Sequence, residues 1–492
     1  MVARGAEQEV VPPRADCLVE SLRAFSYELP TAIADLVDNS VSAGARRVWV
    51  DFYWDGAESC IAVTDDGRGM TEAQLVDAMR LGSTSPLAPR KPRDLGRFGL
   101  GLKTASFSQC RRLTVRSKQR SGKPATWRWD LDQIVRTNEW VLLRDGDDAA
   151  RHFQRLEELG SGTAIVWQNL DRLVGGDRTG DDRAQARFLT RADRVREHLA
   201  MIFHDLMRGR ESVRLFINDS LITPWDPYLQ DEPATQVLPI TRLDFRGSLV
   251  SVHPFVLPHH SKISAQILNA AAGPHGWNAH QGFFVYREGR LLVPGDWLGL
   301  GWAREEHYKL ARIRLDIPNT LDLDWAIDVT KSRASPPAAL REQLRGIAER
   351  TRAAAKRVYT FRGAKLTPAA DADRVFLWEP VAKHDKIRYR LNREHPLLKQ
   401  ALSKGRDRAS LSALLSLIEE TVPVSHITIQ SAENPGSMRD PFEGIADSQV
   451  REVMSQVFRA LVSSGWAEDE ARDRIRTLWP FELFPALLET IR

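Results

Sequence analysis

The stretch AIADLVDNSVSAGA at residues 32–45 decides the fold of this 492-residue chain. Pro30 suits the first turn of a helix, Gly44 suits the position just past its end, and the apolar residues between them recur at helical spacing. The sequence therefore predicts a helix from about Pro30 to Ala43, with one apolar stripe turned towards a core.

Two polar residues share the helix face opposite to much of this stripe. Asp35 and Asn39 are four positions apart, so one lies above the other. A carboxylate can orient and activate a water molecule, and an amide oxygen one turn later is a hard ligand for Mg²⁺, which keeps most of its waters and uses phosphate oxygens. Taken alone, the spacing D-x-x-x-N more often marks a solvated polar face.

A strand that ends in a glycine turn follows this helix. Strand-forming residues occupy positions 46–54 and 59–65, and the second run ends in VTDDGRGM at residues 63–70. The Asp65 carboxylate can accept a hydrogen bond from the exocyclic amine of adenine, and Gly69 lets the backbone approach the ring. A plain β-turn explains the same residues equally well when they are considered alone.

A third glycine-rich segment, GRFGLGLKTA at residues 96–105, precedes another expected helix. Its three glycines lie in front of exposed helix N–H groups, which favour anionic phosphate oxygens, so we interpret the segment as a phosphate cradle. It is not a P-loop, because in a P-loop the lysine directly follows the last glycine, whereas here Leu102 separates Gly101 from Lys103. It is not a dinucleotide fingerprint either, because a proline-rich loop at residues 82–94 precedes it instead of a buried strand.

The rest of the pattern predicts three regions. A capping box of Thr71 and Gln74 begins a helix that reaches about Met79. Further strands and helices of the first region are expected at residues 111–118, 125–131, 163–168, 183–207 and 213–219. The second region is expected to hold strands at 282–292 and 312–317 and a helix from Ala338. A charged linker near residues 362–373 leads to a helix-rich third region, with apolar periodicity at 411–418 and 450–461.

Composition limits the class of protein. Hydrophobic residues make up 42% and charged residues 27% of the chain, and the mean hydropathy is −0.35, as in ordinary soluble globular proteins. No apolar run approaches the ~20 residues that span a bilayer, and no signal peptide is evident, so we expect a cytoplasmic protein without membrane contact. Three cysteines without CxxC spacing indicate neither a disulfide framework nor a zinc site. A net charge of +4 permits a DNA partner without requiring one.

The glycine-rich motifs stand in an order that resembles the GHKL superfamily of ATPases (gyrase, Hsp-type chaperones, histidine kinases and MutL). Its N, G1, G2 and threonine motifs resemble, in turn, AIADLVDNSVSAGA, VTDDGRGM, GRFGLGLKT and GSGTAIVW at residues 160–167. The D-N-S of the first motif and the FGLGLKTA of the third are most similar to the microrchidia (MORC)-like and MutL-like branches. The resemblance implies an α+β fold with three parts. These are an N-terminal Bergerat-fold α/β sandwich whose mixed sheet is covered by helices (1–230), a transducer-like, S5-type α/β domain (231–360) and a helix-rich C-terminal region for dimerisation or partner binding (375–492).

The resemblance also implies roles for individual residues. Asp35 takes the position of the general base, and Asn39 that of the Mg²⁺ ligand. Asp65 would accept from the adenine amine with help from Gly69 and Thr163. The other implied nucleotide-binding residues are Gly67, Met70, Gly96, Phe98, Gly99, Leu100, Gly101, Leu102 and Lys103. Residues 82–98 would form the ATP lid, and the expected cofactors are ATP and Mg²⁺.

A downstream segment, IDVTKSRA at residues 327–334, resembles the loop with which the transducer domain of gyrase-like and MutL-like ATPases inserts a lysine into the nucleotide site. Lys331 would be that lysine, and Arg333 is the second candidate. A cation that reaches the γ-phosphate from another domain distinguishes ATP from ADP and stabilises the charge that develops on the phosphoryl group. The alternative is an ordinary surface lysine. A histidine kinase is disfavoured, because no histidine precedes Asp35.

The resemblance implies a Mg²⁺-dependent ATPase that closes as a homodimeric clamp when it binds ATP. Hydrolysis is expected to be slow, because Asp35 is one methylene shorter than the glutamate usual at this position. The clamp would act on duplex DNA or on a nuclease or other partner in antiviral defence or repair. The alternatives are an ATP-binding scaffold that does not hydrolyse ATP and a chaperone-like machine without DNA.

Basic residues near the predicted lid are candidates for contact with DNA phosphates. They are Arg90, Lys91, Arg93, Arg111, Arg112, Arg116, Lys118, Arg120 and Lys123. Runs of charge are more often solvated faces, but contact with DNA phosphates needs only a positive surface and no recognisable motif. The sequence therefore favours neither a DNA contact nor a solvated surface over the other.

Overall fold

The structure of the protein is a computed structural model that describes residues 13–24, 27–82, 101–144, 146–327, 334–360, 377–383, 386–404, 408–423, 427, 441–476, 478, 480–481 and 484–488. The chain divides into two compact units, Met1–Arg362 and Gly363–Arg492. The first unit contains two sheets with separate hydrophobic cores, and the second unit has a core of its own.

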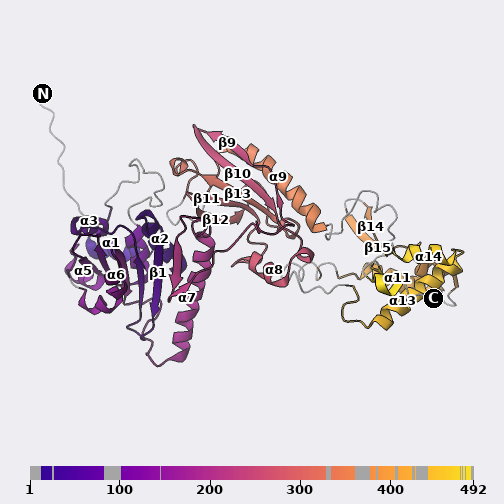
Figure 1. The fold of residues 1–492 in the computed structure, drawn as a ribbon, viewed down its shortest axis with the longest axis horizontal. Helices are drawn as coiled ribbons and strands as arrows, with labels where there is room; N and C mark the ends of the chain where they lie inside the picture. The colour runs from indigo at the N-terminus through magenta and orange to yellow at the C-terminus, as the bar shows by residue number, and fades with distance from the viewer. Residues whose placement is uncertain are drawn as a thin grey trace. The chain divides into compact units, whose positions relative to one another are not determined.

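The first sheet is mixed and has seven strands in the order β4-β3-β5-β2-β1-β6-β7 (Figure 1). The strands are β1 Arg47–Tyr53, β2 Cys60–Asp65, β3 Arg112–Lys118, β4 Ala125–Asp130, β5 Gly162–Gln168, β6 Arg214–Ile217 and β7 Ser220–Leu221. Only β1 and β6 pair in parallel, and the other neighbours pair antiparallel. The strands predicted from the sequence are confirmed to within one residue at each end, except that β6 ends two residues before the predicted strand.

Helices pack against this sheet. They are α1 Ala15–Arg23, α2 Leu29–Ser42, α3 Glu72–Met79, α4 Gly101–Gln109, α5 Leu131–Thr137, α6 Gln154–Glu158 and α7 Asp182–Ile202, with a 3₁₀ helix at Asp147–Phe153. The predicted apolar stripe of α2 (Ile33, Leu36 and Val37) has no solvent exposure, and α2 packs against α4 and α7. The predicted capping box of α3 is confirmed, because the Thr71 hydroxyl accepts from the Gln74 N–H and the Gln74 side chain accepts from the Thr71 N–H.

Helix α7 ends earlier than predicted. Helical periodicity continued to about Met207, but the helix ends at Ile202. Beyond it the chain turns, so that His204 and Asp205 contact the second sheet. His204 Nε2 lies 2.9 Å from the Tyr286 hydroxyl, and Asp205 accepts two hydrogen bonds from Arg314, at 2.8 and 2.9 Å. A tertiary contact therefore overrides the local pattern.

The second sheet has the order β12-β11-β13-β10-β8, and β9 also pairs with β10. Its strands are β8 Gln236–Val237, β9 Thr241–Phe245, β10 Ser248–Val256, β11 Gly282–Arg287, β12 Arg290–Asp296 and β13 Ala311–Ile317. Its helices are α8 Ala265–Ala272 and α9 Ala338–Thr360, with 3₁₀ helices at His260–Lys262, Glu306–Tyr308 and Asn319–Leu321. Helix α9 contacts β10 and β13 and lies along one face of this sheet (Figure 1).

The second unit is rich in helices, as predicted, but also contains a hairpin that the sequence pattern did not indicate. The hairpin is β14 Trp378–Lys383 and β15 Lys386–Leu391. The helices are α10 Pro396–Lys404, α11 Arg408–Glu420, α13 Asp447–Ser463, α14 Glu468–Arg476 and α15 Pro485–Leu488. The predicted α+β fold class is confirmed, while the division into three domains stays a prediction. Among the described residues, none of the helices combines the length and apolar character needed to cross a membrane.

Candidate functional site

Helix α2 carries a buried carboxylate and an exposed amide one turn apart. Only 3% of Asp35 is exposed, and its Oδ2 accepts a hydrogen bond of 3.1 Å from the Tyr27 hydroxyl. Asn39 is exposed on the same helix. The site thus combines the buried carboxylate of Asp35, which can accept hydrogen bonds, with the solvent-exposed amide of Asn39, whose oxygen can bind a metal ion. Tyr27 was missed from the sequence, because it lies outside the helix and no spacing rule connects it to Asp35.

A second buried carboxylate lies at the end of β2. Asp65 is 4% exposed, its Oδ2 accepts from the Ser40 hydroxyl at 2.9 Å, and its Oδ1 accepts from the Gly67 N–H at 2.9 Å. Burial raises the pKa of Asp65 to about 6, although the Gly67, Ser40 and Thr163 hydrogen bonds lower it. Because each carboxylate oxygen has two lone pairs, Asp65 can still accept from another donor. Ser40 links this strand end to α2 and was also missed.

Glycines let backbone segments approach closely around Asp65. Gly69 has a φ of +65°, and a Cβ there would lie 1.9 Å from the Lys118 carbonyl oxygen. A Cβ on Gly162, whose φ is +150°, would lie 2.0 Å from the Asp65 carbonyl oxygen. Thr163 is directly opposite Asp65 in the β2–β5 register. The strand ends of β2, β3 and β5 are therefore held together where the sequence predicted a nucleotide.

The Gly69 turn should not tolerate a side chain. Gly69→Ala must move backbone out of the way and hold a strained positive φ, so we expect a loss of about 2 kcal/mol or more in the free energy of unfolding. Urea unfolding of the full chain measures this loss. Gly44→Ala is the matched control, because Gly44 has a φ of +77° but nothing lies within 4 Å of its Cβ position. The free energy of unfolding should fall by only about 1 kcal/mol in this control. Equal losses in the two variants would show that the Lys118 backbone does not crowd the Gly69 turn.

Helix α4 begins next to Asp35. Its first described residue is Gly101, where a Cβ would lie 3.8 Å from Asp35 Oδ2, so this end of α4 is close to the carboxylate. The Lys103 side chain, only 2% exposed, donates from Nζ to the Ala78 carbonyl at 3.0 Å, and burial lowers its pKa to about 8. The predicted contact of Lys103 with phosphates stays a prediction.

Several predicted site residues lie outside the described residues. They are Gly96, Phe98, Gly99, Leu100, Lys331 and Arg333, together with the predicted lid apart from Gly82. Of the remaining residues that were predicted to bind nucleotide, Met70 and Leu102 are half-buried and pack against the first core, and the Met70 N–H donates to the Ser117 hydroxyl at 2.9 Å.

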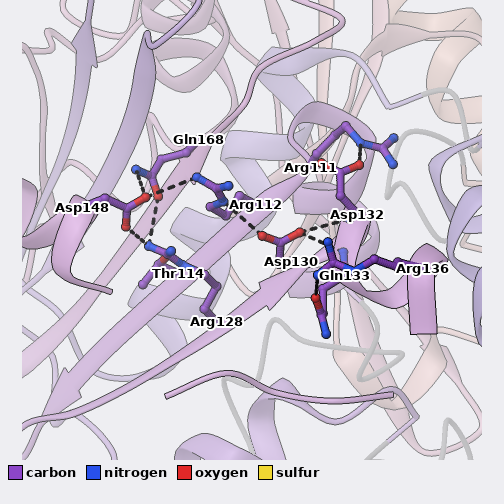
Figure 2. Close-up of polar contacts among 10 residues, drawn as sticks. All are labelled: Arg111, Arg112, Thr114, Arg128, Asp130, Asp132, Gln133, Arg136, Asp148 and Gln168. Carbon is purple, nitrogen blue, oxygen red and sulfur yellow. Dashed lines mark hydrogen bonds and ion pairs between the residues drawn. The ribbon is translucent and has the colours of Figure 1, made fainter. Parts of the chain in front are cut away.

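The predicted basic surface on β3 is largely matched by acidic side chains. Arg111 contacts Asp132 at 2.7 Å and Glu20 at 3.0 Å. Arg112 contacts Asp130 at 3.3 Å and Asp148 at 3.2 Å, and Asp148 also pairs with Arg128 (Figure 2). Arg116 and Lys118 both pair with Glu157, at 2.7 and 3.9 Å. Acidic side chains therefore pair with all four residues, and their contact with DNA phosphates stays a prediction.

A metal ion at this site would have few protein ligands. Within the described ranges, no group of three or more His, Cys, Asp or Glu side chains could hold a metal ion. Mg²⁺ suits such a place, because it keeps several waters and takes oxygens from phosphates. The exposed amide of Asn39 would fit as a single protein ligand to an ion that arrives with a nucleotide.

Comparison with known proteins shows that part of the chain is similar to a known family. Residues 27–163 match the family described as histidine kinase-, DNA gyrase B-, and HSP90-like ATPase. The chain is 36% identical over 92 residues to DNA mismatch repair protein MutL of Dictyoglomus turgidum, which is 18% of this chain and 16% of that protein. It is 34% identical over 89 residues to ATPase morc-1 of Caenorhabditis elegans, which is 18% of this chain and 10% of that protein. A longer match, 29% identical over 176 residues, covers 36% of this chain and 26% of MutL of Sphingopyxis alaskensis. The matches therefore span only a small part of these relatives.

Proposed function

We propose that this chain, whose residues 27–163 belong to the GHKL family of ATPases, is a Mg²⁺-dependent ATPase that works as a nucleotide-gated dimeric clamp. The observation that carries the proposal is the link between two buried carboxylates. Asp65 at the end of β2 is hydrogen-bonded to Ser40, and Ser40 lies on the same helix as Asp35 and Asn39. One bound nucleotide can thus reach both carboxylates. Its adenine would contact Asp65, and its phosphates would lie near Asp35 and Asn39 on α2.

Each residue has a distinct task in this proposal. Asp65 accepts a hydrogen bond from the adenine amine, and the positive φ of Gly69 keeps the turn close to the ring. Asn39 binds Mg²⁺ and Asp35 orients the attacking water, while the N–H groups at the start of α4 stabilise phosphate charge. Lys331 would reach the γ-phosphate from the second domain. Hydrolysis is slow, because the short Asp35 side chain reaches the water less well than a glutamate would.

The proposal that the clamp acts on DNA, or on a nuclease, defence or repair partner, has separate support. The MutL relatives are DNA mismatch repair proteins by name, and the chain carries a net charge of +4. Most basic residues of β3 are paired with acids, so the phosphate contacts are proposed to come from exposed Arg120 and Lys123 and from the lid residues Arg90, Lys91 and Arg93.

The full chain tests this proposal directly. With Mg²⁺ present, we expect phosphate release from ATP, a dimer with a non-hydrolysable ATP analogue and a return to the monomer with ADP. Duplex DNA should raise turnover or stabilise the dimer. Light scattering and phosphate release, each measured with and without DNA, give these results. Nucleotide binding and closure without phosphate release would favour the scaffold, and turnover and dimerisation that DNA leaves unchanged would favour the chaperone-like machine.

A further inference from the structure

A buried ion pair connects the candidate nucleotide helix to the second sheet. Asp38 of α2 has no solvent exposure, and the side chain of Arg290, the first residue of β12, is 2% exposed. Arg290 Nε donates to Asp38 Oδ1 at 2.8 Å across 252 positions of sequence. Neither charge contacts bulk water, so separating them costs far more than separating a surface pair.

The position of Asp38 gives this pair its significance. Asp38 follows Asp35 by three residues and directly precedes Asn39, so it belongs to the turn of α2 that carries both candidate catalytic groups. The other two polar links described between the sheets, Tyr286–His204 and Arg314–Asp205, reach the segment after α7 instead. Among these three links, only the Arg290–Asp38 pair acts on α2.

A pocket lies beside the pair. It has a volume of about 420 Å³, is partly open to solvent, and is lined by the first turn of α2, by α7 and by β12, with Arg290 in its wall. His198 lines the same pocket, but burial and then Arg290 lower its pKa to about 3, so it is neutral near pH 7. Arg290 therefore supplies positive charge beside Asp38, at a place where α2 and β12 border space that no side chain fills.

We propose that Arg290 is a positioning residue that couples the second sheet to catalysis through Asp38. When nucleotide moves the second sheet, α2 follows β12, because the two buried charges stay together. Asp35 and Asn39 then reach their working positions relative to the phosphates. This inference rests on the proposed function, since it concerns how the ATPase site is completed.

Paired substitutions separate coupling from stability. Arg290→Met alone removes a cation from beside a buried carboxylate and should destabilise the fold, whereas the double variant Asp38→Leu/Arg290→Met replaces both charges with apolar groups and should restore much of the thermal midpoint. The matched control is Asp322→Leu/Arg287→Met. Arg287 and Asp322 form a similarly buried pair, with side chains 2% and 6% exposed and 2.7 Å between Nε and Oδ1. Arg287 ends β11 and Asp322 directly follows the 3₁₀ helix Asn319–Leu321, so this pair does not involve α2.

The expected result is a split between kcat and nucleotide affinity. The Asp38/Arg290 double variant should bind ATP within twofold of wild type, because Asp65 is unaltered, while kcat falls about 10- to 100-fold. Its second sheet should also lose the change in protease sensitivity that the ATP analogue causes in wild type. The control variant should keep all three properties.

Two outcomes would contradict the proposed coupling between Arg290 and the ATPase site. A double variant with wild-type kcat and wild-type protease response overturns the coupling, and so does a control variant that loses as much as the Asp38/Arg290 variant. A wild-type chain that neither binds nor hydrolyses ATP instead overturns the proposed function. The wild-type arm of the same experiment therefore distinguishes the two failures.

Discussion

Replacing Asp35 by alanine should lower the kcat for ATP hydrolysis by a factor on the order of 10² to 10⁴ and leave ATP binding nearly unchanged. The reason is that Asp35 is the buried carboxylate beside the N-terminus of α4, where it can orient the attacking water. Adenine recognition depends on Asp65, which the substitution leaves intact. Phosphate release under single-turnover conditions, together with ATP titration by calorimetry, measures the two effects separately.

A buried carboxylate on the sheet against which α2 packs provides the control for this experiment. Asp51 on β1 is 6% exposed and lies 3.6 Å from Arg155, outside the candidate site. Asp51→Ala should cost stability but leave kcat within about twofold of wild type, since it has no role in the proposed chemistry. If Asp35→Ala hydrolyses ATP as fast as Asp51→Ala, Asp35 is not the general base and the ATPase mechanism proposed above fails.

Asp65→Asn should weaken ATP binding by about 10- to 100-fold, because the adenine amine loses a charged acceptor in a site that excludes water. The kcat at saturating ATP should change much less, since Asp35 and Asn39 are unaltered. Fluorescence titration with a labelled ATP analogue gives the dissociation constant. A variant that binds ATP as tightly as wild type would remove Asp65 from adenine recognition.

The pH dependence of binding provides the control for this second prediction. Burial raises the pKa of Asp65 from its usual value to about 6, so the carboxylate gains a proton as the pH falls through 6. The protonated form has lost part of its capacity as an acceptor. Wild-type affinity for ATP should therefore fall between pH 7 and pH 5, whereas the affinity of Asp65→Asn should be nearly flat across this range.

Local sequence patterns predicted most strands of the first sheet, and the runs at 282–292 and 312–317 of the second, but gave no prediction for β8, β9 or β10. Helix α2 and the capping box of α3 depend on neighbouring residues, so periodicity and turn chemistry were sufficient to find them. The end of α7 was not predictable in this way, because His204 and Asp205 leave the helix to contact a sheet formed almost a hundred residues later.

The candidate site was predictable only as a set of motifs. Asp35, Asn39, Asp65 and Gly69 are marked by their spacing. Tyr27 and Ser40 have no such mark, because their hydrogen bonds to the two carboxylates exist only in the folded chain. Pairing of charges was predictable least of all. Arg116 belongs to a locally basic run, yet its partner Glu157 lies forty-one positions further along.

The strand order of the first sheet has a consequence for synthesis of the protein. Strand β5 is the neighbour of both β2 and β3, so Asp65 obtains its partner Thr163 only after about a hundred further residues have been made. At ~5–20 residues per second, the edge of β2 waits roughly 5 to 20 s for that partner on the ribosome. Strand β1 waits longer still for β6. The nascent chain thus presents unpaired strand edges during translation, which makes this sheet the part of the molecule most exposed to aggregation before folding is complete.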